Sequence, residues 1–177
     1  MNRIALFHKV SFEQYLKDYC DTYGFNSEDE AEVKKIKEIW ESIKLPVRAT
    51  TGSAGYDFFA PKTIVLMPGE TTKIPTGIRA EIDDGWALKC YPRSGLGFKY
   101  RLQLNNTVGI IDSDYFYSDN EGHIFAKITN DSNEEKTIHV NAGDGFMQGI
   151  FEMYGITKDD NAVNKRNGGF GSTTGKN

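Results

Sequence analysis

The stretch from Thr63 to Tyr91, TIVLMPGETTKIPTGIRAEIDDGWALKCY, decides the fold class. Its short apolar runs are separated by turn signals, of which Pro68-Gly69 and Asp84-Gly85 are the clearest. Strands and turns that alternate about every 8–12 residues are typical of an antiparallel sandwich or barrel. The pattern continues toward the C-terminus, and it predicts strands at residues 63–66, 71–75, 78–82, 86–91, 103–104, 124–129 and 136–140.

The chain before this stretch changes its period. Residues 3–10 are expected to form a strand, after which apolar side chains recur at helical spacing from Phe12 to Tyr23 and from Val33 to Ile43. We predict a helical hairpin over residues 11–43, here called the hairpin. Its simplest interpretation is a packing or oligomer-contact appendage, and a partner-binding module is the alternative.

Both predicted helices begin with a capping-box pattern. Ser11 with Gln14 is expected to start the first helix, and Ser27 with Glu30 the second. Gly24 is a natural end for the first helix, because glycine adopts the left-handed conformation of a helix C-terminus without strain.

Composition sets the outer limits. The 177 residues favour one domain, and a net charge of -4 without a Lys/Arg cluster argues against nucleic-acid binding. No apolar run approaches the ~18 residues of a membrane helix. Cys20 and Cys90 stand alone, so we expect reduced packing residues in a cytoplasmic protein. Glycine is concentrated after residue 50: only Gly24 of the 18 glycines precedes it.

Four stretches differ from ordinary strands and turns, namely Ala54–Asp57, Pro92–Gly97, Gly109–Tyr115 and Arg166–Gly175. Each alone could be a loop. Together they supply arginine, hydroxyl and glycine N–H groups that suit phosphate oxygens. Phe170 could stack on a base, and Asp112, beside two isoleucines, could be a general base at a strand end. The combination indicates nucleotide hydrolysis. The three histidines are isolated and lack metal-ligand spacing.

These stretches and one more occur in a set order: Ala54–Asp57, Pro92–Gly97, Gly109–Tyr115, Gly143–Gln148 and Arg166–Gly175. In this order the chain resembles the trimeric, all-β dUTP pyrophosphatase (dUTPase) family over residues 45–177 and the first strand. The resemblance implies a mainly β fold, a distorted, jelly-roll-like antiparallel β-barrel with the helical hairpin added near the N-terminus. The single domain would comprise a first strand (1–10), the hairpin insertion (11–43), the barrel (44–160) and a flexible lid arm (161–177).

The resemblance also implies an activity. It is the hydrolysis of dUTP to dUMP and pyrophosphate, which keeps uracil out of DNA and supplies dUMP for dTMP synthesis. Water attacks the α-phosphorus, and Asp112 matches the residue that orients and activates that water. Tyr115 matches the residue that packs on deoxyribose and excludes a 2′-hydroxyl. Asn106 lies where uracil is read, mainly through backbone groups, and Gly109 is a further substrate-binding position. The implied compartment is the cytoplasm of a bacterium or of a phage-infected cell.

Further roles are implied by the same resemblance. The phosphate-contacting positions are Arg93, Ser94, Gly95 and Gln148. In the tail, Arg166, Gly171 and Ser172 would close over the triphosphate with Phe170 on the uracil ring. Mg²⁺ is expected on substrate oxygens and waters rather than in a protein cage, with Asp57 nearby. The family's site combines three subunits of a homotrimer, the tail coming from a neighbour.

The chain departs from the family pattern at four places. Gly145 stands near the usual motif-four arginine, and only Asn167 separates Arg166 from Gly-Gly-Phe-Gly. Phe116–Glu121 forms an extra loop after Tyr115, and the hairpin is inserted before Leu45-Pro46.

Two alternatives stay open. A dUTPase-like regulatory or protein-binding subunit could use the hairpin and the extra loop as contact surfaces. A dCTP deaminase would share the fold and the trimer. Ser94-Gly95 and the GGFGS tail favour the pyrophosphatase over the deaminase.

Overall fold

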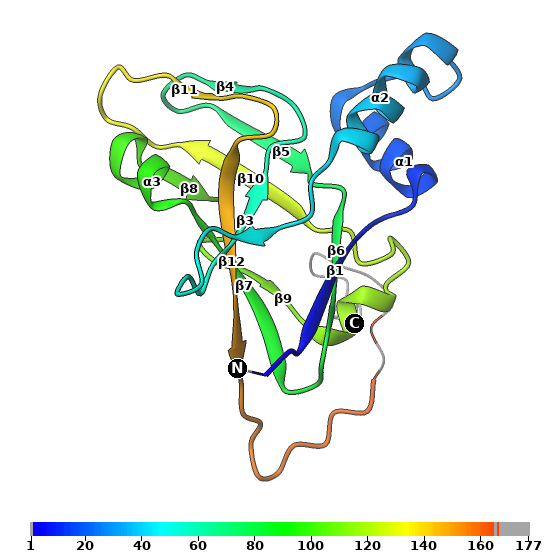
Figure 1. Cartoon of the computed structure of the whole chain (residues 1–177), viewed down its shortest axis with the longest axis vertical. Helices are drawn as coiled ribbons and strands as arrows, with labels where there is room; N and C mark the ends of the chain where they lie inside the picture. The colour runs from blue at the N-terminus through cyan, green and yellow to red at the C-terminus, as the bar shows by residue number, and fades with distance from the viewer. Residues whose placement is uncertain (1, 165, 167–177) are drawn as a thin grey trace, which may run out of the picture.

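The computed structural model describes residues 2–164 and residue 166. The first strand, β1 (Ala5–Lys9), pairs antiparallel with β6 (Ile78–Ile82). The helices α1 (Phe12–Tyr23) and α2 (Glu30–Ser42) follow and project from one corner of the sheet body (Figure 1). The other strands are β2 (Val47–Arg48), β3 (Tyr56–Phe59), β4 (Ile64–Leu66), β5 (Thr71–Pro75), β7 (Trp86–Pro92), β8 (Leu102–Leu104), β9 (Gly109–Ile111), β10 (Phe125–Asn130), β11 (Ile138–Val140) and β12 (Gly145–Met153). A short helix, α3 (Ser94–Tyr100), and a 3₁₀ helix, η1 (Ser113–Tyr117), complete the described elements.

The strand pairings of the described residues are all antiparallel. The largest sheet has the order β2-β3-β12-β7-β9, and smaller sheets have the orders β5-β10-β8, β11-β4 and β1-β6. These separate sheets wrap around a shared interior (Figure 1). The predicted fold class, mainly β with an added helical hairpin, is therefore confirmed.

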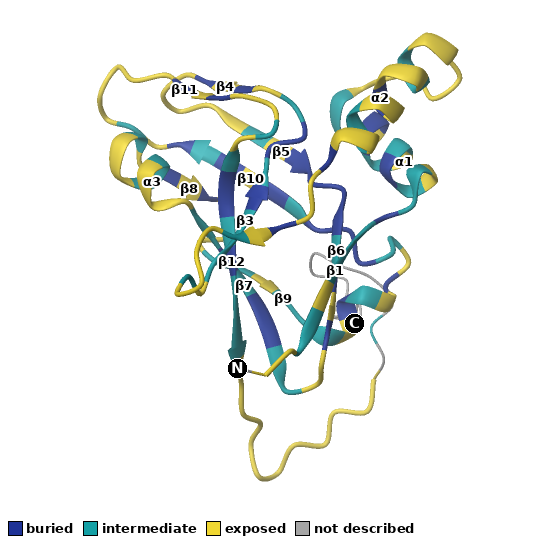
Figure 2. Cartoon of the chain, viewed as in Figure 1, coloured by how far each residue is buried: buried dark blue, intermediate teal, exposed yellow. Residues whose placement is uncertain are grey.

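Among the described residues, one cluster of buried apolar side chains extends through the sheets and the hairpin (Figure 2). It contains Phe58, Leu88 and Phe146 from the sheets and Tyr15 and Ile36 from the hairpin. Tyr15 is fully buried, whereas most of the surface of α2 faces solvent. Because the hairpin shares the core of the sheet body, its removal would expose apolar surface on both parts.

Gly77 marks the place where the hairpin meets the sheet body. Its φ of 74° lies in the left-handed region, and a Cβ at this position would collide with the Ile43 side chain. The same Cβ would lie 3.3 Å from the Tyr15 ring. Gly77 is therefore required both by the backbone turn and by the close approach of the hairpin.

The ends of α1 are as predicted. Ser11 Oγ accepts a hydrogen bond of 3.1 Å from the backbone N–H of Gln14, and Gly24 ends the helix with a φ of 73°. The side chain of Gln14 does not return to Ser11; it donates to Asp18 instead, at 2.8 Å. The Ser11 N–H donates to Glu121, so the second half of the capping box is supplied by a distant carboxylate.

The predicted start of the second helix was wrong by two residues. Asp29, not Ser27, is the N-cap of α2. Asp29 Oδ1 accepts hydrogen bonds from the backbone N–H groups of Ala31, at 2.9 Å, and Glu32, at 3.2 Å. Aspartate caps helices as well as serine does, and its charge favours the positive end of the helix dipole.

Elements that were not predicted include β2, β3, η1, β12 and α3, and the longest of these are β12 and α3. Glycines within β12 and α3 obscure the strand pattern of the first and the helix pattern of the second. Gly149 interrupts the apolar run of β12, yet the space is needed: a Cβ there would lie 2.7 Å from Leu88 Cδ1 and 3.0 Å from Phe58 Cε2. Helix α3 contains Gly95 and Gly97, which are poor helix formers, so the sequence suggested a loop.

Within the described residues, no helix combines the length and the apolar character needed to cross a membrane. Cys20 and Cys90 are both buried and free, as predicted. Burial raises the pKa of the Cys90 thiol to about 12, so it stays protonated at neutral pH.

Candidate active site

The site is built on the end of β9. This strand pairs with β7, Ile111 lying opposite Leu88 and Gly109 opposite Cys90. Asp112 follows the last strand residue and is the N-cap residue of η1. Asp112 therefore lies at the edge of the sheet. Tyr115, one turn later in η1, lies on the same side of the sheet as Asp112.

A cavity of about 720 Å³ lies beside this strand end. Five of the residues selected from the sequence line it together: Asn106, Gly109, Asp112, Tyr115 and Arg166. These residues come from the β8–β9 turn, β9, η1 and the C-terminal segment. A cavity with an apolar wall and a few convergent polar groups is the usual form of a small-molecule site.

The Tyr115 ring is held rigidly in the cavity wall. The residue is only 5% exposed, and its hydroxyl donates a hydrogen bond of 2.7 Å to the backbone carbonyl of His123. Asn120 Nδ2 donates to the same hydroxyl oxygen at 2.9 Å. Burial raises the pKa of Tyr115, an effect that the Asn120 hydrogen bond only partly opposes, so the hydroxyl remains a donor at neutral pH.

Arg166 closes one side of its own chain's cavity through two carboxylates, whereas the resemblance implied that the tail of a neighbouring subunit lies there. Its Nη2 contacts Asp112 Oδ2, and its Nε donates to Asp114 Oδ1 at 2.8 Å. The guanidinium carbon lies 5.8 Å from the centre of the Tyr115 ring. A planar guanidinium that pairs with two carboxylates can equally pair with phosphate oxygens, which share their charge and spacing.

Five other predicted residues lie in a second cluster, outside this cavity. Arg93 Nε is 3.2 Å from Asp57 Oδ1, and Gln148 Nε2 donates to the Pro92 carbonyl at 3.3 Å. Ser94 and Gly95 form the first turn of α3, directly after Arg93. One chain thus divides the predicted site residues between two places, the cavity with Asp112 and the cluster with Arg93.

Gly145 belongs to the second cluster. Arg93 Nη1 donates to the Gly145 carbonyl at 3.3 Å. A Cβ on Gly145 would lie only 2.7 Å from that same nitrogen. The Arg93 side chain therefore occupies the space beside Gly145, near which the resemblance leads us to expect another arginine.

The remaining predicted tail residues, Phe170, Gly171 and Ser172, lie outside the described residues, as does Asn167. Conversely, the cavity includes residues that no sequence motif indicated. Lys73 on β5 and Phe125 on β10 are examples, with Lys73 Nζ 4.3 Å from the centre of the Phe125 ring. Lys73 and Phe125 come together at the cavity because β5 pairs with β10. No local sequence pattern predicts this pairing.

In the described part of the chain, no group of three or more histidine, cysteine or acidic side chains could hold a metal ion. The polar groups at the strand end are the carboxylates of Asp112 and Asp114, which are 45% and 54% exposed. Exposed carboxylate oxygens suit a hydrated Mg²⁺ ion, which keeps most of its water ligands.

Comparison with known proteins identifies the family. The dUTPase family model matches residues 41–174, and the chain belongs to this family. The deoxyuridine 5′-triphosphate nucleotidohydrolase of Lactococcus lactis subsp. lactis is 42% identical over 134 residues, which are 74% of this chain and 88% of that protein.

Solved structures agree with this assignment. The dUTPase from Streptococcus mutans is 36% identical, with a TM-score of 0.57 over 64% of this chain and 88% of that one. A mutant dUTPase from phage phi11 of Staphylococcus aureus has a TM-score of 0.56 over 70% of this chain and 92% of that one. At 23% identity it supports the fold alone, and its own structure coordinates a structural Mg(II) ion.

Proposed function

We propose that this protein is a dUTP diphosphatase that hydrolyses dUTP to dUMP and pyrophosphate. The observation that carries the proposal is the convergence of Asp112, Tyr115, Asn106 and Arg166 on one cavity. These residues were selected from separate motifs, and the fold gives them a shared position in a chain of the dUTPase family.

In the proposed reaction, Asp112 orients a water molecule and accepts one of its protons. The water oxygen forms a bond to the α-phosphorus, and the bond from that phosphorus to the bridging oxygen of pyrophosphate breaks. The products are dUMP and pyrophosphate, and Asp112 returns its proton to solvent. Positioning of the water, electrostatic stabilisation of the phosphate charge and proton acceptance each contribute to the acceleration of such a displacement.

The other cavity residues bind and select the substrate. Tyr115 packs on the deoxyribose ring, where a 2′-hydroxyl would have no room, and the turn with Asn106 and Gly109 reads the uracil edge. Arg166 exchanges its carboxylate partners for phosphate oxygens when the nucleotide binds. The tail residues Phe170, Gly171 and Ser172 are proposed to complete this closure over the base and the phosphates.

Mg²⁺ is the proposed cofactor, bound through triphosphate oxygens and waters, with Asp57 nearby. When bound, it neutralises charge on the phosphate chain. The exposed carboxylates at the strand end can accept hydrogen bonds from the water ligands of such an ion.

We also propose a homotrimer in which each site is shared. The separation of the Arg93 cluster from the Asp112 cavity supports this arrangement, since Arg93, Ser94, Gly95 and Gln148 would then bind phosphates beside the Asp112 of a neighbouring subunit. The buried free thiols fit a reducing compartment, and we place the enzyme in the cytoplasm of a bacterium or of a phage-infected cell.

A substrate panel tests the activity. The full chain would be given dUTP, UTP, dCTP and dTTP with Mg²⁺, and pyrophosphate and ammonia would be measured separately. Pyrophosphate from dUTP in clear preference to the others is expected. Ammonia release from dCTP would identify a deaminase instead, and no product from dUTP would refute the proposal.

A further inference from the structure

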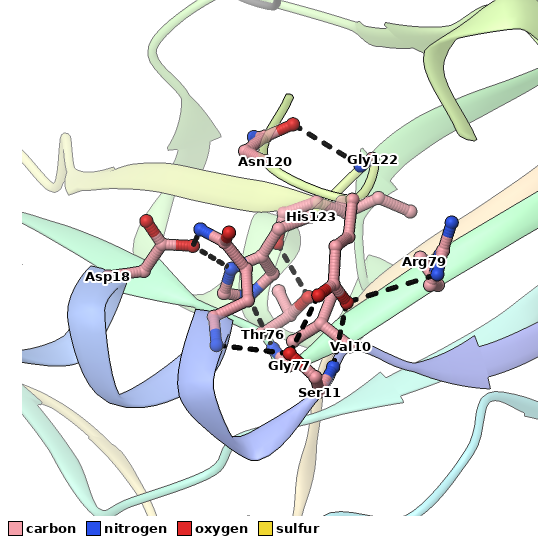
Figure 3. A network of polar contacts seen from close by, with 12 residues as sticks. Val10, Ser11, Asp18, Thr76, Gly77, Arg79, Asn120, Gly122 and His123 are labelled. Atoms are coloured by element: carbon pink, nitrogen blue, oxygen red, sulfur yellow. Dashed lines mark hydrogen bonds and ion pairs between the residues drawn. The ribbon is translucent and has the colours of Figure 1, made fainter. Parts of the chain in front are cut away.

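The two insertions of this chain meet behind the cavity. Ser11, at the start of the hairpin, donates from its backbone N–H to Glu121 Oε2 at 2.8 Å and from its hydroxyl to Glu121 Oε1 at 2.7 Å. Glu121 is the last residue of the extra loop that follows Tyr115. Figure 3 shows this junction beside Arg79, whose Nη1 lies 3.9 Å from the same carboxylate.

A buried acid–histidine pair lies next to this junction. His123, which follows the extra loop, is fully buried, and its Nδ1 is 2.5 Å from Asp18 Oδ2 on α1 (Figure 3). Only 12% of the Asp18 side chain is exposed. The other ring nitrogen, Nε2, is 2.8 Å from the backbone nitrogen of Gly77.

The contact with Gly77 settles which nitrogen carries the proton. A backbone N–H can only donate, so His123 Nε2 must accept and is unprotonated. The proton therefore sits on Nδ1 and is donated to Asp18. Asp18 fixes both the tautomer and the orientation of the ring, as the carboxylate partners of functional histidines do.

His123 in turn supports the cavity wall in two ways. Its backbone carbonyl accepts the hydrogen bond from the Tyr115 hydroxyl, and its ring packs against Phe125 with 4.5 Å between ring centres. Tyr115 and Phe125 both line the cavity. A chain of direct contacts therefore runs from the hairpin to the wall that would face the sugar.

We propose that Asp18 is a positioning residue for substrate selection: through His123 it holds Tyr115 and Phe125 in the place that excludes a 2′-hydroxyl. This inference rests on the proposed function, because it concerns the choice between dUTP and UTP. It gives the hairpin a role in selectivity, although the hairpin contributes no residue to the cavity as the structure describes it.

The test compares kcat/KM for dUTP and for UTP in the full chain and in three variants. Asp18→Ala leaves the His123 Nδ1–H without its acceptor, and the dUTP preference should fall about tenfold, the effect of one lost hydrogen bond. Asp18→Asn keeps an acceptor oxygen and should keep the preference within about twofold. Asp21→Ala removes an exposed acid from the same helix and should leave the preference unchanged.

Oligomeric state and thermal unfolding would be measured for each variant, with Asp18→Ser replacing the alanine variant if that chain fails to fold. An unchanged preference in folded Asp18→Ala overturns the proposal, and so does an equal loss in Asp18→Asn. A wild-type chain that releases no pyrophosphate from dUTP contradicts the proposed function instead. In that case, the dissociation constants of the non-hydrolysable analogues α,β-imido-dUTP and α,β-imido-UTP would be measured for wild type and the same variants. The ratio of the two constants then tests the role of Asp18 without the need for turnover.

Discussion

Asp112 and Arg166 form the most informative pair of residues in the cavity. The guanidinium contacts the carboxylate that is proposed to activate water, so the proposed base is paired with a cation. Triphosphate oxygens offer the same guanidinium a stronger partner, because they carry more charge. Binding of the nucleotide would thus separate Asp112 from Arg166 and leave its carboxylate free to accept a proton from water.

Replacing Asp112 by asparagine tests the general-base role. Asparagine keeps the size of the side chain but cannot accept the proton, so kcat for dUTP should fall by roughly 10²–10⁴-fold with little change in KM. Steady-state pyrophosphate release measures both constants. Asp119→Asn, an exposed acid of the extra loop, is the matched control, and equal turnover by the Asp112 variant would exclude the assigned role.

At the scale of elements, the hairpin and the extra loop are joined by hydrogen bonds and stabilise each other. The carboxylate of Glu121 joins them through its two hydrogen bonds from Ser11. Burial alone would raise the pKa of Glu121, but the hydrogen bonds from Ser11 and the charge of Arg79 more than offset this and lower the pKa. The ionised form therefore stabilises the fold.

Thermal unfolding over a series of pH values tests the contribution of the Glu121 carboxylate to stability. Because the folded pKa of Glu121 is lowered, its contribution is fully present above the unfolded value of about 4.5 and is lost as the pH falls through the folded pKa. Glu121→Gln should lower Tm by about 2–4 °C at neutral pH, and the gap from wild type should close in acid. Glu28→Gln, on an exposed turn, should show no gap; a Glu121 gap that persists unchanged in acid would contradict the ionic contribution.

The predictability of the elements follows from their patterns. Strand β6, which has apolar alternation, and strand β5, which follows the Pro68-Gly69 turn signal, could be predicted from the sequence, and so could the amphipathic α1. Strand β12 could not, because Gly145 and Gly149 are set by close packing against Arg93 and Leu88, which are distant in the chain. The protein-binding role considered for the hairpin stays a prediction.

At the scale of the whole molecule, the main feature is the division of the site. Motif order suggested which residues bind substrate, but not that one chain holds Arg93 and Asp112 in separate places. Nor could it supply Lys73 and Phe125, which only strand pairing brings to the cavity. Candidate site residues in recognisable motifs could therefore be predicted from the sequence. Their positions relative to one another could be learned only from the folded structure.

Subunit mixing tests the shared site. Arg93→Ala and Asp112→Asn chains should each be nearly inactive alone. After dissociation and reassembly in equal amounts, about a quarter of the sites should combine an intact Arg93 with an intact Asp112 from a neighbour, and activity should recover toward that fraction. Mixing without subunit exchange is the control. Activity that never exceeds the sum of the separate variants would mean that each site lies within one chain.

The position of bond cleavage is the most direct measure of the chemistry. Hydrolysis of dUTP by the full chain would be run in H₂¹⁸O with Mg²⁺, and both products would be analysed by mass spectrometry. Water attack at the α-phosphorus predicts one ¹⁸O atom in the phosphate of dUMP and none in pyrophosphate. Label in pyrophosphate, or no hydrolysis of dUTP, would contradict the mechanism.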